Sequence, residues 1–378
     1  MKSSHFVKFA TGAAAGVLMA LAVGPTLAAG PEVVAGPSTD PACFAPDGAD
    51  TKFLQYPANA GPFRIALVNG FIANDWRVQM IRVAKAYAAQ PDVAKDIKEL
   101  KVVSVGPDVP AQIAAVNNFI DQGYDAVVVD ANSTTAFAGV VKKANAAGVV
   151  VLSFDNVIED PMGVEVNVDQ KGIGTKAGEF LIKEVKADPA NLLFVRGPVG
   201  QPVDQARATG FAEALKASGR KFNVTEVVGN WNPGDAQKVT ADAIAAGGKF
   251  DGIYVEAGSQ GAAQAAVDAG VKVPMVGEDE NAYRLMCNDN HDAGMHCQSG
   301  GTGPAQSAVA LKVTIAALKG EAIPQKLALP TSFSFSPYKV GTEAFPELPG
   351  STFTGNSFPA CKIGFTNEEI SKQTGDNN

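Results

Sequence analysis

One segment of the chain occurs twice in related form. Residues 124–130 read Tyr-Asp-Ala-Val-Val-Val-Asp, and residues 250–256 read Phe-Asp-Gly-Ile-Tyr-Val-Glu. Each copy is followed by an alanine-rich, helix-like stretch and then by a second apolar strand that ends in an acid, Asp155 or Asp279. A duplicated strand–helix–strand unit predicts two similar lobes with parallel sheets, and such sheets bind ligands beyond the carboxyl ends of their strands. The repeat therefore places an acid at the same edge of each lobe, where two facing lobes would form a cleft.

Apolar strands and helix-like segments alternate along most of the 378 residues, a length typical of two or three domains. The strands are apolar on both faces, as parallel strands between helices must be. In the first series we expect strands at 63–69, 100–105, 126–130 and 149–154, and helices at 74–88, 110–122 and 134–147. In the second series we expect strands at 191–196, 222–228, 252–256 and 273–277, and helices at 172–186, 203–217, 235–246 and 260–269. A last helix is expected at 305–319, before a proline-rich end.

The amino-terminal segment has the pattern of a secretory signal peptide. Lys2 and Lys8 precede an uncharged run that ends in small residues at Ala28 and Ala29. A transmembrane anchor is the alternative, but glycines and a proline interrupt the run and no charged stop follows it. Removal of residues 1–29 would leave 29 basic and 39 acidic residues, a net charge of −10. An acidic chain without a basic cluster is a poor candidate for binding nucleic acid.

Four cysteines fit an oxidising compartment, and they allow three pairings. We predict that Cys287 pairs with Cys297, because they bracket a polar loop at 288–296 with little apolar material to hold it. We predict that Cys43 pairs with Cys361, which would tie a proline-rich leader to a tail rich in proline and glycine.

A zinc-binding site is the alternative interpretation of the loop between Cys287 and Cys297. It contains His291 and His296, together with two aspartates, Asp289 and Asp292. No CxxC or HExxH spacing supports a zinc site, so we predict no bound metal.

The chain offers little material for catalysis. After the predicted signal segment only His291 and His296 remain, so a site of the Ser-His-Asp or Cys-His type has few components. The residues after the first strand do not form a dinucleotide-binding glycine motif. Acids are plentiful near the strand ends, at Asp155, Glu278, Asp279 and Glu280. Paired carboxylates suit glycoside hydrolysis, but they also bind sugar hydroxyls, and binding requires fewer coincidences of geometry.

Several motifs occur together in a characteristic order. An Ala-Leu-Val strand has an aromatic residue just past it, Phe154-Asp155-Asn156 closes the fourth strand, Arg207-Ala-Thr-Gly-Phe211 lies on a helix, and Val276-Gly277-Glu278-Asp279 follows. With the export signal, this order resembles the periplasmic sugar-binding proteins of the ribose/galactose-binding type, which are the substrate receptors of ABC importers. The resemblance covers roughly residues 63–319.

The resemblance implies an α/β fold with two similar lobes, each a parallel sheet flanked by helices, joined by a hinge of three crossings. It implies a first lobe of residues 62–163 and 299–325 and a second lobe of residues 164–298. A leader at 30–61 and a tail at 326–378 would lie outside the lobes, with the tail held by its disulfide.

The resemblance also implies a set of ligand-binding residues in the cleft. The matching positions are Asn74, Trp76, Arg77, Asp155, Asn156, Arg207, Trp231, Glu256, Glu278, Asp279 and Gln298. The chain departs from the family pattern at Asn156, where an arginine is typical, and at Ala257, where a polar residue is usual. Aromatic faces in such a set suit the C–H side of a sugar ring.

Together with the resemblance, these residues predict a monomeric periplasmic binding protein, not an enzyme, that binds a monosaccharide or related small polar ligand and needs no cofactor. Its expected partner is an ABC importer permease in the inner membrane. Two alternatives stay open: a binding protein for a nitrogen-bearing or cationic small molecule, and a secreted hydrolase that uses Asp155 and Asp279.

Overall fold

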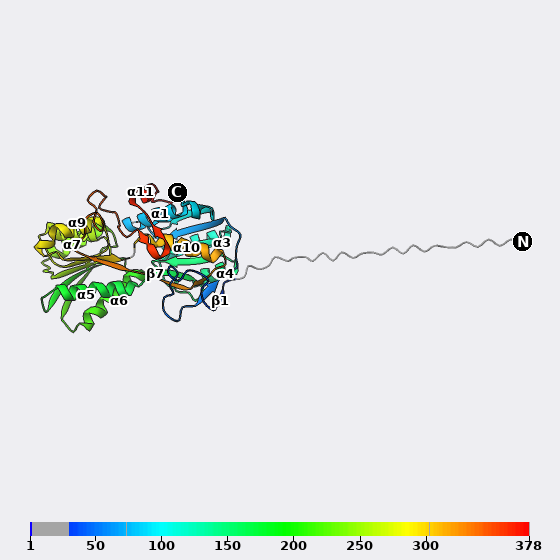
Figure 1. Cartoon of the computed structure of the whole chain (residues 1–378). Coiled ribbons are helices and arrows are strands. Elements are labelled where there is room, and N and C mark those ends of the chain that lie inside the picture. The colour runs from blue at the N-terminus through cyan, green and yellow to red at the C-terminus, as the bar shows by residue number, and fades with distance from the viewer. Residues whose placement is uncertain (2–29, 73, 302, 378) are drawn as a thin grey trace.

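The computed structural model describes Met1 and residues 30–377 apart from residues 73 and 302, and it has two lobes (Figure 1). The predicted signal segment, except for Met1, lies outside the described residues. In this part of the chain no helix combines the length and the apolar character needed to cross a membrane.

The first lobe is built on a six-stranded parallel sheet in the order β14-β7-β6-β5-β3-β4. Its strands are β3 (Phe63–Asn69), β4 (Ile97–Ser104), β5 (Ala126–Asp130), β6 (Val150–Phe154), β7 (Val164–Val168) and β14 (Lys326–Leu329). Its helices are α1 (Asp75–Ala88), α2 (Pro91–Ala94), α3 (Val109–Asp121), α4 (Ala138–Ala146) and α10 (Gln306–Leu318). Every residue of β5 and β6 is buried, because helices cover both faces of the sheet.

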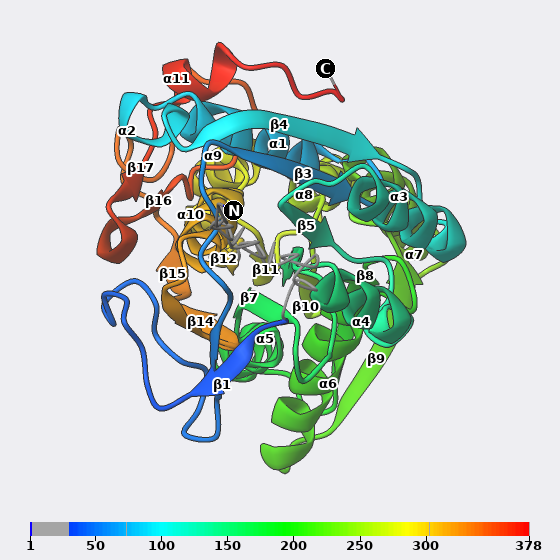
Figure 2. The same cartoon turned by 90° about the vertical axis from the view of Figure 1, so that its right-hand side faces the viewer.

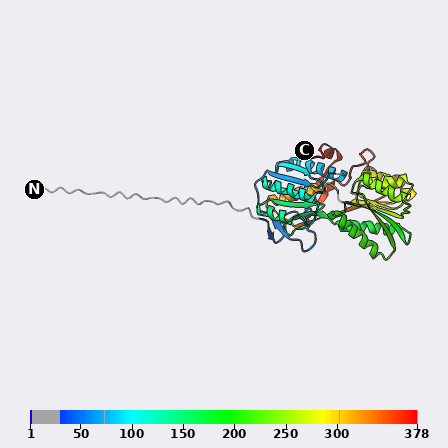
Figure 3. The same cartoon turned by 180° about the vertical axis from the view of Figure 1, so that it is seen from behind.

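The second lobe has a six-stranded sheet in the order β15-β12-β11-β10-β8-β9, in which only the edge strand β15 is antiparallel. Its strands are β8 (Ala190–Arg196), β9 (Phe222–Val228), β10 (Gly252–Val255), β11 (Met275–Gly277), β12 (Cys297–Gly301) and β15 (Ser332–Phe335). Its helices are α5 (Gln170–Glu184), α6 (Pro202–Ala217), α7 (Pro233–Ala245), α8 (Ser259–Asp268) and α9 (Asn281–Asn290), with a 3-10 turn η1 (His291–Ala293). Seen from behind, the two lobes again lie side by side (Figure 3).

The leader and the tail both attach to the first lobe. Strands β1 (Glu32–Val34) and β2 (Phe53–Gln55) form a small antiparallel sheet with β13 (Ala322–Pro324). The tail contains β16 (Ser357–Phe358), the turn η2 (Pro359–Cys361), β17 (Ile363–Gly364) and α11 (Asn367–Ser371). Figure 2 shows α11, β16 and β17 gathered at one side of the first lobe.

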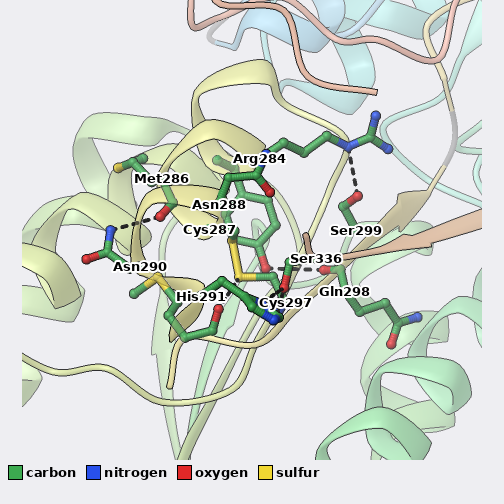
Figure 4. Close-up of a disulfide and its surroundings, with 12 residues drawn as sticks. Arg284, Met286, Cys287, Asn288, Asn290, His291, Cys297, Gln298, Ser299 and Ser336 are labelled. Carbon is green, nitrogen blue, oxygen red and sulfur yellow. Dashed lines mark hydrogen bonds between the residues drawn. A yellow bond between two sulfur atoms is a disulfide. The ribbon is translucent and has the colours of Figure 1, made fainter. Parts of the chain in front are cut away.

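Both predicted disulfides are confirmed. Cys43 joins Cys361, and Cys287 joins Cys297. Figure 4 shows the second bond, with His291 and Ser336 close to it. The polar stretch between its cysteines differs from the expected loop, because α9 continues to Asn290 and η1 follows directly.

The three predicted crossings are present: between β7 and α5, between β12 and α10, and between β14 and β15. The lobe boundaries differ from the predicted ones by the whole of β7 at the first and by the last three residues of β12 at the second. β7 pairs with β6 and so belongs to the first lobe, although the predicted boundary was at 163/164, and β12 keeps residues 299–301 in the second lobe. The tail expected from residue 326 supplies β14 to one sheet and β15 to the other. Short edge strands after prolines have too few residues for their pattern to reveal them.

Candidate functional site

A cavity lies between the two lobes at the carboxyl ends of their strands, and its empty space, including the open solvent at its mouth, is about 310 Å³. Both lobes contribute to its lining. The first lobe supplies Asn74, Trp76, Arg77 and Asp155, and the second supplies Val203, Arg207, Trp231, Ala257 and Glu278.

The start of α1 forms the wall of the cavity in the first lobe. The Asn74 side chain caps the helix by accepting a hydrogen bond from the Arg77 backbone N–H at 2.9 Å, which fixes Trp76 and Arg77 just beyond β3. Arg77 is 1% exposed and its Nη1 lies 2.7 Å from Oδ2 of Asp130, which is fully buried. Its guanidinium also lies 4.3 Å from the centre of the Phe71 ring. Burial raises the pKa of Asp130 to about 7, although the neighbouring Arg77 opposes that rise.

Asp155 lies at the floor of the cavity, just past the end of β6. Its backbone has a φ of 57°, in the left-handed region, so the strand turns sharply and the side chain is directed away from the ladder. The Asp155 carboxylate accepts hydrogen bonds from the side chains of Gln306 at 3.0 Å, Gln170 at 3.3 Å and Asn156 at 3.0 Å. Gln306 and Gln170 are the first residues of α10 and α5, the helices that follow two of the crossings. The Asp155 carboxylate is therefore held by two residues that directly follow hinge crossings.

A series of polar side-chain contacts continues from Asp155 into the second lobe. Oε1 of Gln170 accepts a hydrogen bond from Arg207 Nε at 3.0 Å, and Nη1 of Arg207 lies 2.7 Å from Oε1 of Glu278. All four side chains are nearly buried, so the network links the lobes in an environment where an unpaired charge would be costly. Burial raises the pKa of Glu278 to about 8, and Arg207 opposes the rise.

The position of Arg207 depends on an unusually close pair of helices. A Cβ on Gly174 of α5 would collide with the Arg207 carbonyl, and a Cβ on Gly210 of α6 would collide with the carbonyl of Lys171. The glycine in the Arg-Ala-Thr-Gly-Phe motif therefore lets α6 pack against α5, which brings Arg207 within reach of Gln170.

Trp231 forms the second aromatic part of the lining and is held from behind by Glu256. Its Nε1 donates to Oε2 of Glu256 at 2.9 Å, and the Gly197 N–H donates to the same oxygen at 3.0 Å. The ring stacks against Phe71 of the first lobe, with centroids 6.4 Å apart. Burial, together with the nearby Asp204, raises the pKa of Glu256 to about 8. Phe71 and Trp231 thus bring the two lobes into direct contact.

Comparison with known proteins identifies the family. A sequence profile described as a periplasmic binding protein domain matches residues 65–322, more than half of the chain. The chain belongs to the periplasmic binding protein family. It is similar to the galactofuranose-binding protein of Escherichia coli, with 26% identity over 298 residues that cover 74% of this chain and 90% of the relative. It is also similar to a D-ribose/D-allose-binding protein of Pseudomonas aeruginosa, with 32% identity over 180 residues, 44% of this chain and 54% of the relative.

Solved structures support the same fold. A galactofuranose-binding protein superposes with a TM-score of 0.64 at 21% identity, covering 83% of this chain and all of the other. A periplasmic solute-binding protein of Actinobacillus succinogenes with bound D-allose gives 0.62 at 21% identity, covering 72% and 96%. A solute-binding protein of an ABC transporter from Thermobispora bispora gives 0.66 at 25% identity, covering 82% and 94%. The predicted two-lobed fold of a periplasmic binding protein is therefore confirmed.

The lining of this periplasmic binding protein contains seven of the eleven predicted site residues: Asn74, Trp76, Arg77, Asp155, Arg207, Trp231 and Glu278. The other four lie outside the lining. Asn156 lies behind it and bonds to Asp130, Asp155 and the Val203 N–H, and Glu256 lies behind Trp231.

Asp279 and Gln298 depart further from the prediction. The Asp279 carboxylate lies against Gly355 of the tail, where a Cβ would collide with it. Gln298 is a buried residue of β12, between Val276 on β11 and Phe335 on β15. The glutamine that reaches Asp155 from the crossing after β12 is Gln306, eight positions later. A helix start after a crossing is the signal that would have identified Gln306.

The histidines of the zinc alternative lie in the second lobe, outside the cavity lining. His291 contacts the Ser336 hydroxyl at 2.9 Å and His296 contacts Glu184 at 3.0 Å. Within the described ranges, no group of three or more His, Cys, Asp or Glu side chains is arranged to hold a metal ion.

Proposed function

We propose that this periplasmic binding protein is the substrate receptor of an ABC importer and that it holds a monosaccharide in the cavity between its lobes. The main support is the composition of that cavity, in which one tryptophan from each lobe accompanies a continuous polar network. Tryptophan faces suit the C–H surface of a sugar ring, and carboxylate, guanidinium and amide groups suit its hydroxyls. Relatives named for galactofuranose, ribose, allose, xylose and fructose agree with this proposal.

The charge of the lining favours a neutral ligand. Arg77 and Arg207 contribute two positive charges, and Asp155 and Glu278 contribute two negative charges. Arg77 is paired with Asp130 behind the lining, and Arg207 is paired with Glu278. A cationic ligand would need a surplus of carboxylates in the lining, and its described residues have none, because the two carboxylates are matched by two guanidinium groups.

Polar atoms at the site that have no hydrogen-bond partner within the described protein fit the same proposal. They are Nη2 of Arg77, which lines the cavity, and Oε1 of Gln306, whose amide nitrogen bonds to Asp155 of the lining. A buried donor and a buried acceptor of this kind each carry a desolvation cost that a hydroxyl group can remove, because a hydroxyl both donates and accepts.

The proposed mechanism is closure of the lobes over the ligand. A sugar that contacts Trp76 and Asp155 on one side and Arg207 and Trp231 on the other interacts fully only when the lobes are together. It therefore shifts the population toward the closed state. Export by the predicted signal segment would place the protein in the periplasm, where the closed form would be presented to a membrane permease.

Tryptophan fluorescence provides a direct test, because the only two tryptophans of the chain, Trp76 and Trp231, both line the cavity. The mature protein is titrated with monosaccharides, polyols and small amines, and thermal unfolding is measured in parallel. We expect a saturable fluorescence change with a neutral sugar, and a stabilisation of about 2.7 kcal/mol at 100 times its dissociation constant. Saturable binding of amines alone would support the cationic alternative instead.

The hydrolase alternative predicts turnover. We expect aryl glycosides and esters to remain intact when incubated with the protein, since the described lining contains no histidine and its carboxylates are engaged by Gln170, Gln306 and Arg207. Steady product release that is abolished by Asp155→Ala would contradict the binding-protein proposal.

A further inference from the structure

The carboxyl-terminal segment connects the two lobes a fourth time. After β15, Tyr338 and Ala344 are buried in the core of the second lobe, whereas Phe358, Ile363 and Ile370 are buried in the core of the first. We call residues 345–356, which run between these two regions, the strap. The chain leaves the vicinity of α9 and ends beyond α11 on the other lobe, as Figure 1 shows. The strap lies outside the residues 65–322 that match the family profile.

The second lobe holds the strap through the start of α9. The Asn281 side chain donates to the carbonyls of Phe345 at 2.8 Å and Leu348 at 3.2 Å, and its oxygen accepts from the Phe345 N–H at 2.9 Å. The Asn281 N–H donates to the Thr352 carbonyl at 2.8 Å, and the Thr354 N–H donates to the Asp279 carbonyl at 3.1 Å. The last of these bonds attaches the strap to Asp279, the residue that follows Glu278 of the cavity lining.

In the first lobe, the side chain of Gln79 on α1 holds the strap. Its Nε2 donates to the Phe353 carbonyl at 2.8 Å and to Oδ1 of Asn356 at 2.6 Å, and its Oε1 accepts from the Phe353 N–H at 3.0 Å. Gln79 lies two residues after Arg77 on the helix that carries Trp76.

The two sets of bonds follow the alternation of an extended chain. Thr352 and Thr354 direct their backbone groups to the second lobe, and Phe353 between them directs both of its backbone groups to Gln79. In an extended segment, backbone groups of successive residues point to opposite sides, so a strap of this kind can hydrogen-bond to two bodies at once. The strap therefore hydrogen-bonds to both lobes, as a central strand of a sheet does to the strands on its two sides.

The first-lobe end of the strap is fixed covalently. The disulfide between Cys361 and Cys43 ties it to the leader, and Lys312 of α10 donates to the Cys361 carbonyl at 2.7 Å. The strap also passes next to a hinge crossing, because a Cβ on Gly303 would collide with the Gly355 carbonyl. It cannot follow the second lobe outward without breaking its contacts with α1 or those with α9.

We propose that the strap is a built-in restraint on cleft opening, which keeps α1 and the start of α9 together when the lobes move apart. Opening then requires the loss of the Gln79 bonds or of the Asn281 bonds. The proposal of a restraint depends only on the contacts of the strap. A benefit to sugar affinity rests in addition on the function proposed above, because a larger closed population lowers the apparent dissociation constant.

The test measures lobe separation without any ligand, so it is independent of the identity of the sugar. Spin labels are attached at Lys142→Cys on α4 and Gln237→Cys on α7, both exposed, and their distance distribution is recorded by pulsed electron paramagnetic resonance. The native cysteines are engaged in disulfides and do not take the label. Gln79→Met keeps the side-chain volume but removes the bonds of α1 to the strap, and Asn281→Ala removes the side-chain bonds of α9 to Phe345 and Leu348.

Gln325→Met is the matched control, because Gln325 is equally buried and its side-chain amide donates to the carbonyls of Asp160 and Gly163 within the first lobe. We expect the ratio of open to closed molecules to rise roughly tenfold or more in Gln79→Met and in Asn281→Ala, as lost hydrogen bonds predict, with no change in Gln325→Met.

Circular dichroism and thermal unfolding are measured on each variant, so that loss of fold is distinguished from loss of restraint. Distance distributions of Gln79→Met and Asn281→Ala that coincide with that of the parent protein, despite lower unfolding temperatures, would show that the strap only stabilises the fold and would overturn the proposal. A broadened distribution together with the absence of any sugar binding would support the restraint and reject the proposed function.

Discussion

Asp130 and Glu256 close the two copies of the repeated segment, yet they have different surroundings. Asp130 is the last residue of β5 and forms an ion pair with Arg77. Glu256 follows β10, and its carboxylate accepts hydrogen bonds from Trp231 and Gly197 and lies near Asp204, another acid. Duplication therefore explains where each acid lies, but the neighbouring side chains decide whether it balances a cation or positions an aromatic ring.

The largest effect is expected from breaking the ion pair between Arg77 and Asp130 in the first lobe. Arg77→Met leaves the Asp130 carboxylate buried without its cation, and we expect a loss of about 3 to 5 kcal/mol in the free energy of unfolding at pH 8. The loss should be smaller at pH 5, because without Arg77 the pKa of Asp130 rises further and the group can take up a proton. Urea denaturation at both pH values measures this, and equal losses would contradict an ionised Asp130.

The second prediction compares the acids that follow β6 and β11. Asp155→Ala should weaken sugar binding by about 2 to 4 kcal/mol, since it removes a lining carboxylate and leaves Gln170 and Gln306 without their acceptor. Asp279→Ala should weaken binding by less than about 1 kcal/mol, since its side chain lies against the strap. Isothermal titration calorimetry measures both, with circular dichroism as the control for folding. A larger loss for Asp279 would show that this acid contacts the ligand.

The third prediction concerns the pH dependence of the second lobe. Burial raises the pKa of Glu256 from 4.5 to about 8, so the folded protein keeps a proton that the unfolded chain releases near pH 4.5. The contribution of Glu256 to stability is therefore greatest in acid and is lost as the pH rises toward 8.

Glu256→Gln keeps an acceptor for Trp231 and cannot ionise. We expect the decline of unfolding free energy between pH 5 and pH 8 to become shallower in this variant than in the parent protein. Glu213→Gln, at an exposed position on α6, is the control and should leave the slope unchanged. Identical slopes in all three proteins would mean that Glu256 is ionised in the folded state.

Residues next to strand ends could be predicted from the sequence. Trp76, Arg77 and Asp155 follow long apolar strands, so their position at the cavity follows from the parallel-sheet rule alone. Gln170 and Gln306 could not be found in this way, because they begin helices whose starting points depend on where the chain crosses between lobes. Both crossings are set by β7 and β12, strands that the sequence pattern did not separate from their surroundings.

The strap was also beyond prediction from the sequence. Its residues have neither the period of a helix nor that of a strand, and prolines at 346 and 349 interrupt any local pattern. Its path is set instead by tertiary contacts, chiefly those of Gln79 and Asn281. The cysteine pairing predicted that the end of the tail returns to the leader, but it said nothing about the route across the lobes.

The bond between Cys43 and Cys361 has a consequence for the order in which the protein is made. Strands β8 to β12 of the second lobe lie within residues 190–301, so most of its sheet is available before synthesis ends. The first lobe needs α10, β14 and finally Cys361, which lies 318 positions after its partner. Domains generally fold as their segments emerge. The second lobe is therefore expected to fold first. The disulfide that completes the first lobe is expected to form only when nearly the whole polypeptide has reached an oxidising environment.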